Sequence, residues 1–159
     1  MRVAVLTISD AGARGERVDA SGDAIAAWAA ERGDAVVERT LVPDETDRIG
    51  AVLSRWADQD VCDLVLTTGG TGLTPRDVTP EATRAVLEKE APGIAEVLRF
   101  AIYPRFPRAA LSRGVAGVRK RTLVVNLPGS PGGVRDGLAI LGEIVNHAVE
   151  LVRGERTGH

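Results

Sequence analysis

The chain has 159 residues, of which 44% are hydrophobic, and this length and composition favour one domain with a full apolar core. Its 20 basic and 22 acidic residues leave a formal net charge of −2, and only 3% of the residues are aromatic. A polyanion-binding surface or a stacking platform for nucleic acid is therefore not expected.

Cysteine and histidine are too sparse to form a disulfide or a zinc site. Cys62 is the single cysteine, and it begins a predicted buried strand, so we expect it to pack as a small apolar side chain. His147, on a predicted helix, and His159, in the tail, form no cluster with it. No apolar run approaches the length of a membrane span or a signal sequence, so we expect a cytoplasmic protein that binds no membrane.

Short aliphatic segments alternate with segments of helical periodicity along the chain. Strands are predicted at 2–8, 35–41, 63–68 and 122–126, and helices at 21–32, 46–57, 80–89 and 134–152. Residues 93–105 have weaker periodicity, with a helix expected over 97–102, and a small irregular or hairpin excursion is expected near 108–121. The alternation predicts an α/β fold with a three-layer, open, mostly parallel sheet and helices on both faces. We expect a single domain over 1–153, followed by a polar tail at 154–159.

The segment after the third predicted strand is rich in glycine. Gly69, Gly70 and Gly72 follow the strand directly, at the end where open α/β sheets bind ligands. Glycines let backbone N–H groups approach phosphate oxygens, and the hydroxyls of Thr68 and Thr71 can add donors. The segment has neither the G-x-x-x-x-G-K-[ST] nor the G-x-G-x-x-G pattern. A glycine-rich turn that only reverses the chain is an equally good interpretation at this point.

Asp77 lies just before the third predicted helix, for which Thr79 is the expected N-cap and Pro80 the first residue. Its carboxylate is then free to bind Mg²⁺, which prefers oxygen ligands and usually bridges a protein carboxylate and a substrate phosphate. Arg76 offers a positive charge for a phosphate group. The alternative is that Arg76 and Asp77 form a solvated ion pair without a ligand.

Three further loops are expected at the same edge of the sheet, because the carboxyl ends of parallel strands lie together. They contain Asp10, Asp44 and residues 128–131. Asp10, Asp44 and Asp77 can then converge on a phosphate chain, an arrangement suited to metal-assisted chemistry at phosphorus. Two alternatives stay open: Asp44 as the N-cap of the second predicted helix, and Asp10 in a local Asx turn.

The string TTGGTGLTPRDVTPEAT at 67–83 resembles the signature of the MogA/MoaB family of molybdopterin adenylyltransferases, which includes the G domain of gephyrin. Three further parts of the chain resemble other motifs of the family, in the same order: TISD at 7–10 with DASG at 19–22, LVPDE at 41–45, and LSRGVAGVRKRTLVVNLPGSP at 111–131. The resemblance implies the adenylylation of molybdopterin by Mg²⁺ and ATP, with release of pyrophosphate, in molybdenum cofactor biosynthesis. It also implies a homotrimer that passes its product to a metal-insertion enzyme.

The resemblance implies roles for individual residues. Asp44 and Asp77 match the two aspartates of the family that are regarded as catalytic, with Mg²⁺ as the expected metal. The other matched positions are expected to bind the pterin or the nucleotide: Ser9, Asp10, Thr68, Gly69, Gly70, Thr71, Gly72, Ser112, Asn126, Pro128, Gly129 and Ser130. Without the resemblance, a local backbone hydrogen bond is the better interpretation of the Ser112 hydroxyl.

Two positions depart from the family pattern. Ala11 and Gly132 stand where the family commonly has arginine and lysine, and Arg14, Arg17 or Arg135 can compensate for the lost charge. The alternative functions are a non-catalytic pterin-binding or scaffold protein and an enzyme of the later molybdate-insertion step. Both matched aspartates are present, which favours activity, and 159 residues leave no room for the additional domains of an insertion enzyme.

Overall fold

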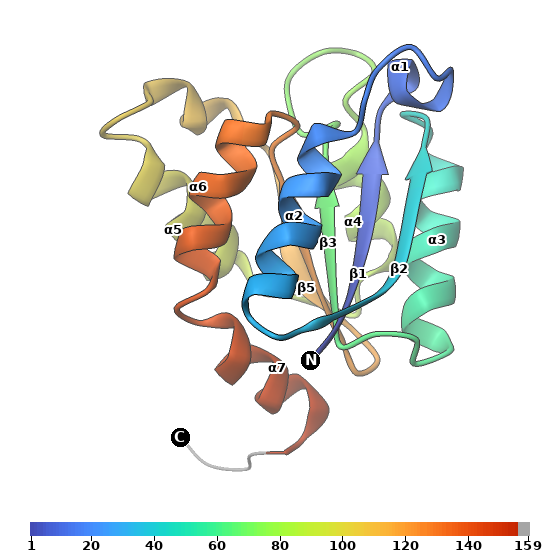
Figure 1. The fold of residues 1–159 in the computed structure, drawn as a ribbon, viewed down its shortest axis with the longest axis vertical. Helices are drawn as coiled ribbons and strands as arrows, with labels where there is room; N and C mark the ends of the chain where they lie inside the picture. Colours follow the sequence, from blue (N-terminus) through green and yellow to red (C-terminus); the bar gives the residue numbers. More distant parts are fainter. Residues whose placement is uncertain (156–159) are drawn as a thin grey trace.

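The computed structural model describes residues 1–155 and has the α/β architecture that the alternation predicts (Figure 1). Within these residues, six strands form one sheet in the order β2-β1-β3-β6-β5-β4. Four strands pair in parallel: β1 (Arg2–Ile8), β2 (Ala35–Val42), β3 (Leu64–Thr68) and β6 (Thr122–Leu127). The short strands β5 (Ala116–Arg119) and β4 (Lys89–Glu90) complete one edge in antiparallel pairing. The predicted fold class is therefore confirmed.

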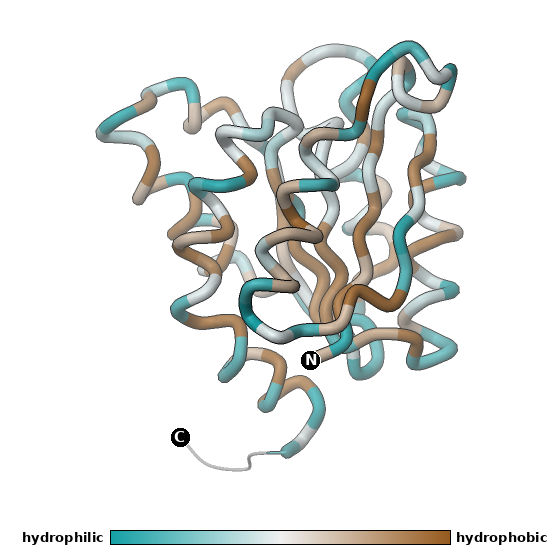
Figure 2. The backbone as a smooth tube through the Cα atoms, viewed as in Figure 1, coloured by the Kyte–Doolittle hydropathy of each residue, from teal (hydrophilic) through white to brown (hydrophobic). Residues whose placement is uncertain are grey.

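Helices cover both faces of the sheet, so the molecule has three layers (Figure 1). One face is covered by α2 (Ala20–Glu31), α5 (Pro92–Ile102), α6 (Pro131–Leu141) and α7 (Val145–Arg153), and the other by α3 (Thr46–Asp58) and α4 (Thr79–Val86). Side chains of a strand alternate between the two faces, so Val3 and Val5 enter one core and Ala4 and Leu6 the other. Burial on both faces explains the continuous aliphatic character of the central strands (Figure 2).

The long helix predicted over 134–152 is wrong, because two helices occupy this region. The first, α6, begins at Pro131, where the Ser130 side chain caps it by accepting a hydrogen bond from the Gly133 amide (3.1 Å). The chain leaves the helix between Gly142 and Ile144, and Ile144, predicted to face inward, is 37% exposed. None of the helices in residues 1–155 is both long and apolar enough to cross a bilayer.

The structure also corrects the ends of α4 and α5. Val78, and not Thr79, is the N-cap of α4, and the helix ends at Val86 because Lys89–Glu90 pairs with β5. Proline is favoured in the first turn of a helix, and α5 accordingly begins at Pro92, earlier than expected. The excursion near 108–121 is a 3₁₀ helix, η1 (Pro107–Leu111), followed by the predicted hairpin of β5 and β6.

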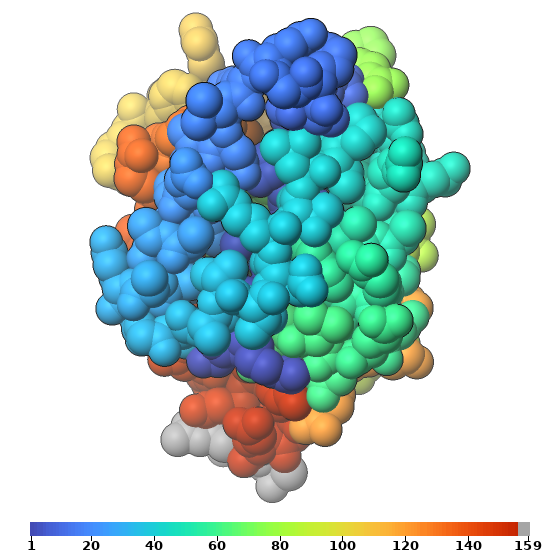
Figure 3. Space-filling model, turned by 45° about the vertical axis from the view of Figure 1, so that its right-hand side comes forward, coloured from blue at the N-terminus to red at the C-terminus, as the bar shows by residue number. Residues whose placement is uncertain are grey.

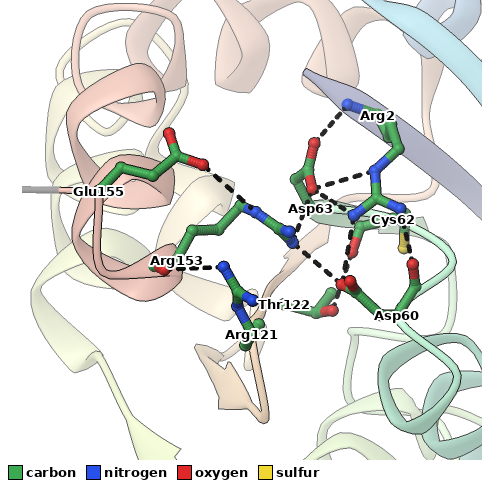
Figure 4. Close-up of polar contacts among 8 residues, drawn as sticks. All are labelled: Arg2, Asp60, Cys62, Asp63, Arg121, Thr122, Arg153 and Glu155. Carbon is green, nitrogen blue, oxygen red and sulfur yellow. Dashed lines mark hydrogen bonds and ion pairs between the residues drawn. The ribbon is translucent and has the colours of Figure 1, made fainter.

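An ion-pair cluster joins α7 to the amino ends of the strands (Figure 4). The Asp63 carboxylate accepts hydrogen bonds from the Arg2 amide (2.7 Å) and the Arg2 guanidinium (2.7 and 3.2 Å). Arg153 Nη1 lies 2.8 Å from Asp63 and 3.0 Å from Asp60. Burial opposes ionisation of Asp63, but the hydrogen bonds from Arg2 and the charges of Arg153 and Arg2 outweigh it and lower its pKa. Arg153 thus anchors the C-terminal end of α7 to the amino ends of β1 and β3.

Cys62 is buried in this region, as expected for a packing residue. Burial raises the pKa of its thiol to about 12. His147 lies on the exposed side of α7, whereas the predicted tail residues 156–159, with His159, lie outside the described residues.

Candidate active site

A cavity of about 420 Å³ opens at the carboxyl ends of the four parallel strands. The segment that follows β1, with the short helix α1 (Asp10–Ala13), forms the top of the molecule next to this edge (Figures 1 and 3). The predicted site residues that line the cavity are Ser9, Asp44, Thr68, Gly69, Gly70, Asp77, Gly129 and Ser130. All four predicted loops therefore contribute to one cavity.

Gly69 and Gly70 hold the loop after β3 in a conformation that favours glycine, with φ of 99° and 65°. A Cβ atom at Gly69 would overlap the carbonyl oxygen of Ile8, and one at Gly70 would overlap Thr79 Oγ1. Thr79 Oγ1 itself donates a hydrogen bond to the Gly69 carbonyl (2.9 Å). These contacts bring the loop close to the loop after β1, so the packing of the cavity requires glycine at both positions.

Asp10 and Asp44 join the loops after β1 and β2. The Asp10 amide donates to Asp44 Oδ2 (2.9 Å), and the Asp44 amide donates to Asp10 Oδ1 (3.0 Å). Arg76 Nε and Nη2 donate to the Asp10 carboxylate, each at 2.9 Å, so the alternative of an ion pair between Arg76 and Asp77 is wrong. The capping interpretation of Asp44 is also wrong, because Glu45 is the N-cap residue of α3 and makes no capping hydrogen bond with its side chain.

The aspartates differ in their electrostatic surroundings. The hydrogen bonds from Arg76 and from the Asp44 amide lower the pKa of Asp10. Burial raises the pKa of Asp44, and the charges of Asp10 and Asp77 add to this effect, which outweighs the hydrogen bond from the Asp10 amide. Asp77 Oδ2 accepts hydrogen bonds from the amide (2.9 Å) and the hydroxyl (2.7 Å) of Thr74, which orient its carboxylate. Within residues 1–155, neither Asp44 nor Asp77 has an ion-pair partner.

Asp44 and Asp77 both line the cavity, and their carboxylates are oxygen donors of the kind that could hold a Mg²⁺ ion shared with a phosphate ligand. Two carboxylates that repel each other at a cavity wall are stabilised by a cation between them. Mg²⁺ is usually bound by one or two carboxylates together with substrate phosphates. In the part of the chain that the structure describes, no three or more His, Cys, Asp or Glu side chains form a group that could hold a metal. A metal bound here would therefore need oxygen ligands from the substrate.

Three polar side chains of the cavity received no role from the sequence: Thr7, Asp19 and Ser21. Asp19 caps α2, accepts a hydrogen bond from Thr7 Oγ1 (2.8 Å) and pairs with Arg39 (2.9 Å). Ser21 Oγ donates to the Gly129 carbonyl (2.8 Å) and so joins α2 to the loop after β6. The signal that could have found Asp19 is its spacing in DASG, which is typical of a helix N-cap.

The side chains of two other predicted residues, Asn126 and Thr68, make hydrogen bonds within the protein. Asn126 is buried, its amide donates to Thr67 Oγ1 (2.9 Å) and Thr83 Oγ1 (3.1 Å), and its carbonyl oxygen accepts from the Val115 amide (3.1 Å). The Thr68 hydroxyl donates to the Pro128 carbonyl (2.6 Å), so its proton is already engaged. Asp10, Thr71, Gly72 and Asn126 are not among the residues that line the cavity.

The comparisons with known proteins identify the family. The sequence profile described as "Probable molybdopterin binding domain" matches residues 4–147. The chain belongs to this family. It is 38% identical over 156 residues to the molybdopterin adenylyltransferase of Helicobacter pylori J99, which covers 97% of this chain and 89% of that protein.

Two further relatives agree with this assignment. The chain is 41% identical over 149 residues, 93% of its length, to the molybdenum cofactor synthesis protein cinnamon of Drosophila melanogaster, but spans only 25% of that protein. The solved structure of the molybdopterin biosynthesis enzyme MoaB from Thermus thermophilus superposes with a TM-score of 0.91 at 53% identity and covers 96% of each chain. The resemblance drawn from the sequence motifs is thus confirmed.

In this member of the molybdopterin-binding family, Ser112 and Pro128 line a second cavity, of about 110 Å³, between α5, η1 and α6. Ser130 lines both cavities. The Ser112 hydroxyl accepts a hydrogen bond from the Gly114 amide (3.3 Å), which is the local contact expected from the sequence alone. Asn126 also lines this second cavity, whereas the predicted residues Asp10, Thr71 and Gly72 line neither of the two.

Proposed function

We propose that this protein is a molybdopterin adenylyltransferase of molybdenum cofactor biosynthesis. It would transfer AMP from ATP to the terminal phosphate of molybdopterin and release pyrophosphate. Relatives that carry this name over most of their length support the proposal. The structural observation that carries it is that Asp44 and Asp77, without a cation partner in residues 1–155, line one cavity with the Gly69–Gly70 loop.

The reaction makes limited demands on the protein. A phosphate oxygen of molybdopterin attacks the α-phosphorus of ATP, a new P–O bond forms, and the bond to pyrophosphate breaks. Negative charge develops on the phosphoryl oxygens and the leaving group, so positioning and electrostatic stabilisation matter more than a strong base. Since the substrate supplies the attacking oxygen, the protein needs no nucleophilic side chain. A bound Mg²⁺ ion would supply positive charge, and Asp44 and Asp77 would hold it.

The remaining groups of the cavity orient the phosphates. The residues that begin α2 and α6, including Ser21 and Ser130, line the cavity, and helix N-termini favour anions. We infer that the phosphate groups occupy the larger cavity and that the pterin extends past Ser130 toward the smaller one, where Ser112 lies. The hydrogen bond from Ser21 to Gly129 keeps these elements in register.

The proposal includes a homotrimer in the cytoplasm that delivers its product to a metal-insertion enzyme. Five apolar side chains of α5, η1 and the segment between them are between 41% and 73% exposed: Val97, Phe100, Tyr103, Phe106 and Leu111. Exposed apolar patches of this kind mark protein interfaces, and they support self-association. Light scattering of the purified protein tests this part, because a monomeric mass at micromolar concentration would contradict it.

The decisive experiment follows pyrophosphate release with MgATP in the presence and absence of molybdopterin. Release that depends on the pterin is expected. Asp44→Asn and Asp77→Asn should each lower the rate on the order of 100-fold, because an amide cannot replace a carboxylate as a Mg²⁺ ligand. Both amides can still accept the hydrogen bonds that the carboxylates accept, so the variants should fold.

Asp47→Asn is the matched control, because Asp47 lies in the exposed first turn of α3 and does not line the cavity. It should keep the parent rate. Full activity in both Asp44→Asn and Asp77→Asn would contradict the proposed site, and pyrophosphate release that is independent of the pterin would contradict the proposed reaction.

A further inference from the structure

The larger cavity, of about 420 Å³, is lined by more acidic than basic side chains. Four charged side chains lie in its wall, namely Arg17, Asp19, Asp44 and Asp77. Asp19 pairs with Arg39 at 2.9 Å, whereas Asp44 and Asp77 have no ion-pair partner in the described part of the chain. Among the described residues of this wall, Arg17 is the only one with a basic side chain.

Arg17 is available to a ligand, in contrast to its neighbours. It lies in the exposed segment between α1 and α2, and its guanidinium makes no hydrogen bond or ion pair with any residue in 1–155. Arg14, three residues earlier, makes two hydrogen bonds of 2.9 Å with Glu16. Arg76 is held by Asp10, so its charge is also engaged.

Arg17 lies two residues before the N-cap of α2. This cap residue, Asp19, accepts a hydrogen bond from Thr7 at the end of β1. The twelve-residue helix α2 then begins at Ala20, which also lines the cavity. Arg17 therefore stands beside a helix N-terminus that itself favours anions, and its charge adds to that field.

A phosphate ligand is negatively charged, and the carboxylates of Asp44 and Asp77 repel it. Its binding therefore needs positive charge from another source. A bound metal ion would offset the charges of these carboxylates, and other groups of the wall would still have to stabilise the phosphate oxygens. A guanidinium presents a planar set of donors that matches two phosphate oxygens at once. Arg17 is the described side chain in the wall with this chemistry.

We propose that Arg17 binds a phosphate group of the substrate in the larger cavity. This inference rests on the proposed function for the identity of the phosphate ligand, which is either the nucleotide or the pterin phosphate. The role is one of substrate binding, so loss of Arg17 should raise KM more than it lowers kcat.

The test compares three variants that each remove one exposed positive charge near this edge: Arg17→Gln, Arg14→Gln and Arg135→Gln. Arg14 and Arg135 do not line the cavity and serve as matched controls. Calorimetric titrations use MgATP, magnesium pyrophosphate and molybdopterin as separate probes. Because a hydrogen bond to a charged group is worth about 1.5 to 3 kcal/mol, Arg17→Gln should weaken the affected probe by about 10-fold or more.

The three probes distinguish a nucleotide phosphate from the pterin phosphate. If Arg17→Gln, and neither control variant, binds MgATP and magnesium pyrophosphate more weakly, Arg17 binds a nucleotide phosphate. If it binds only molybdopterin more weakly, Arg17 binds the pterin phosphate. Equal effects in all three variants, no effect in Arg17→Gln, or no binding of any probe by the parent protein would overturn the proposal. Since these measurements need no turnover, a parent that binds the probes but releases no pyrophosphate would refute the adenylyltransferase reaction without refuting the role of Arg17.

Discussion

Replacing Gly70 by alanine tests the packing and the chemistry of the glycine loop together. Gly70 has φ of 65°, and this left-handed conformation costs an alanine about 1 to 2 kcal/mol. The new Cβ would also overlap Thr79 Oγ1, and disturbing the buried hydrogen bond from Thr79 to Gly69 costs about 1 kcal/mol more. The free energy of unfolding should therefore fall by about 2 to 3 kcal/mol, which lowers Tm by roughly 4 to 12 °C in a domain of this size.

The same substitution should also weaken ligand binding in the molecules that remain folded. The added Cβ would lie 2.9 Å from Asp44 Oδ1, which is closer than real Cβ contacts, so the carboxylate must move. Urea unfolding gives the loss of stability, and titration with MgATP well below Tm gives the loss of affinity. Both losses are expected, because a Cβ atom at Gly70 would meet both the Thr79 hydroxyl, which holds the loop, and the Asp44 carboxylate, which lines the cavity.

Gly132→Ala is the control for this experiment. Gly132 lies in the first turn of α6, and apart from its chain neighbours and the backbone of its own helix, no described atom lies within 4 Å of the position that its Cβ would take. Alanine favours a helix over glycine by about 1 kcal/mol, so stability should be unchanged or slightly higher. If Gly70→Ala keeps the Tm and the MgATP affinity of the parent protein, the reasoning about the loop is refuted.

Two further predictions concern charge. Arg153→Met should lower the free energy of unfolding by about 2 kcal/mol at neutral pH, because Asp63 loses a partner at 2.8 Å. The pKa of Asp63 is lowered in the folded state, so this stabilisation is present above its unfolded pKa and is lost as pH falls through the folded value. Urea unfolding across pH should show the two proteins converge in acid, and a constant difference would contradict the mechanism. In the metal-free protein, Asp44 should take up a proton at a higher pH than an ordinary aspartate, because its pKa is raised by burial. In Arg76→Gln this protonation should move to still higher pH, since the charge of Arg76 lowers the pKa of Asp44, and an NMR titration without Mg²⁺ that shows no change between the two proteins would contradict this reasoning.

The hydrophobic pattern predicted the sheet well because the central strands are buried on both faces. The strands β1, β3 and β6 were found with errors of one residue at most, since each is a nearly continuous aliphatic run. The division of the C-terminal helix was missed, because its apolar spacing continues through Gly142. Arg153 of α7 pairs with Asp60 and Asp63, which are far away in the sequence. The local sequence pattern therefore could not predict this contact.

For the candidate site, the sequence by itself determined which loops meet, because parallel strands place their carboxyl ends at one edge. It also identified the glycines and the aspartates at that edge. Only the tertiary structure decided the partners of each polar group: Arg76 binds Asp10, 66 residues away in the chain, and its neighbour Asp77 forms no ion pair within residues 1–155. The ionisation of a carboxylate depends on the groups that folding brings within a few ångströms of it, and for Asp10 and Asp44 these groups come from other loops.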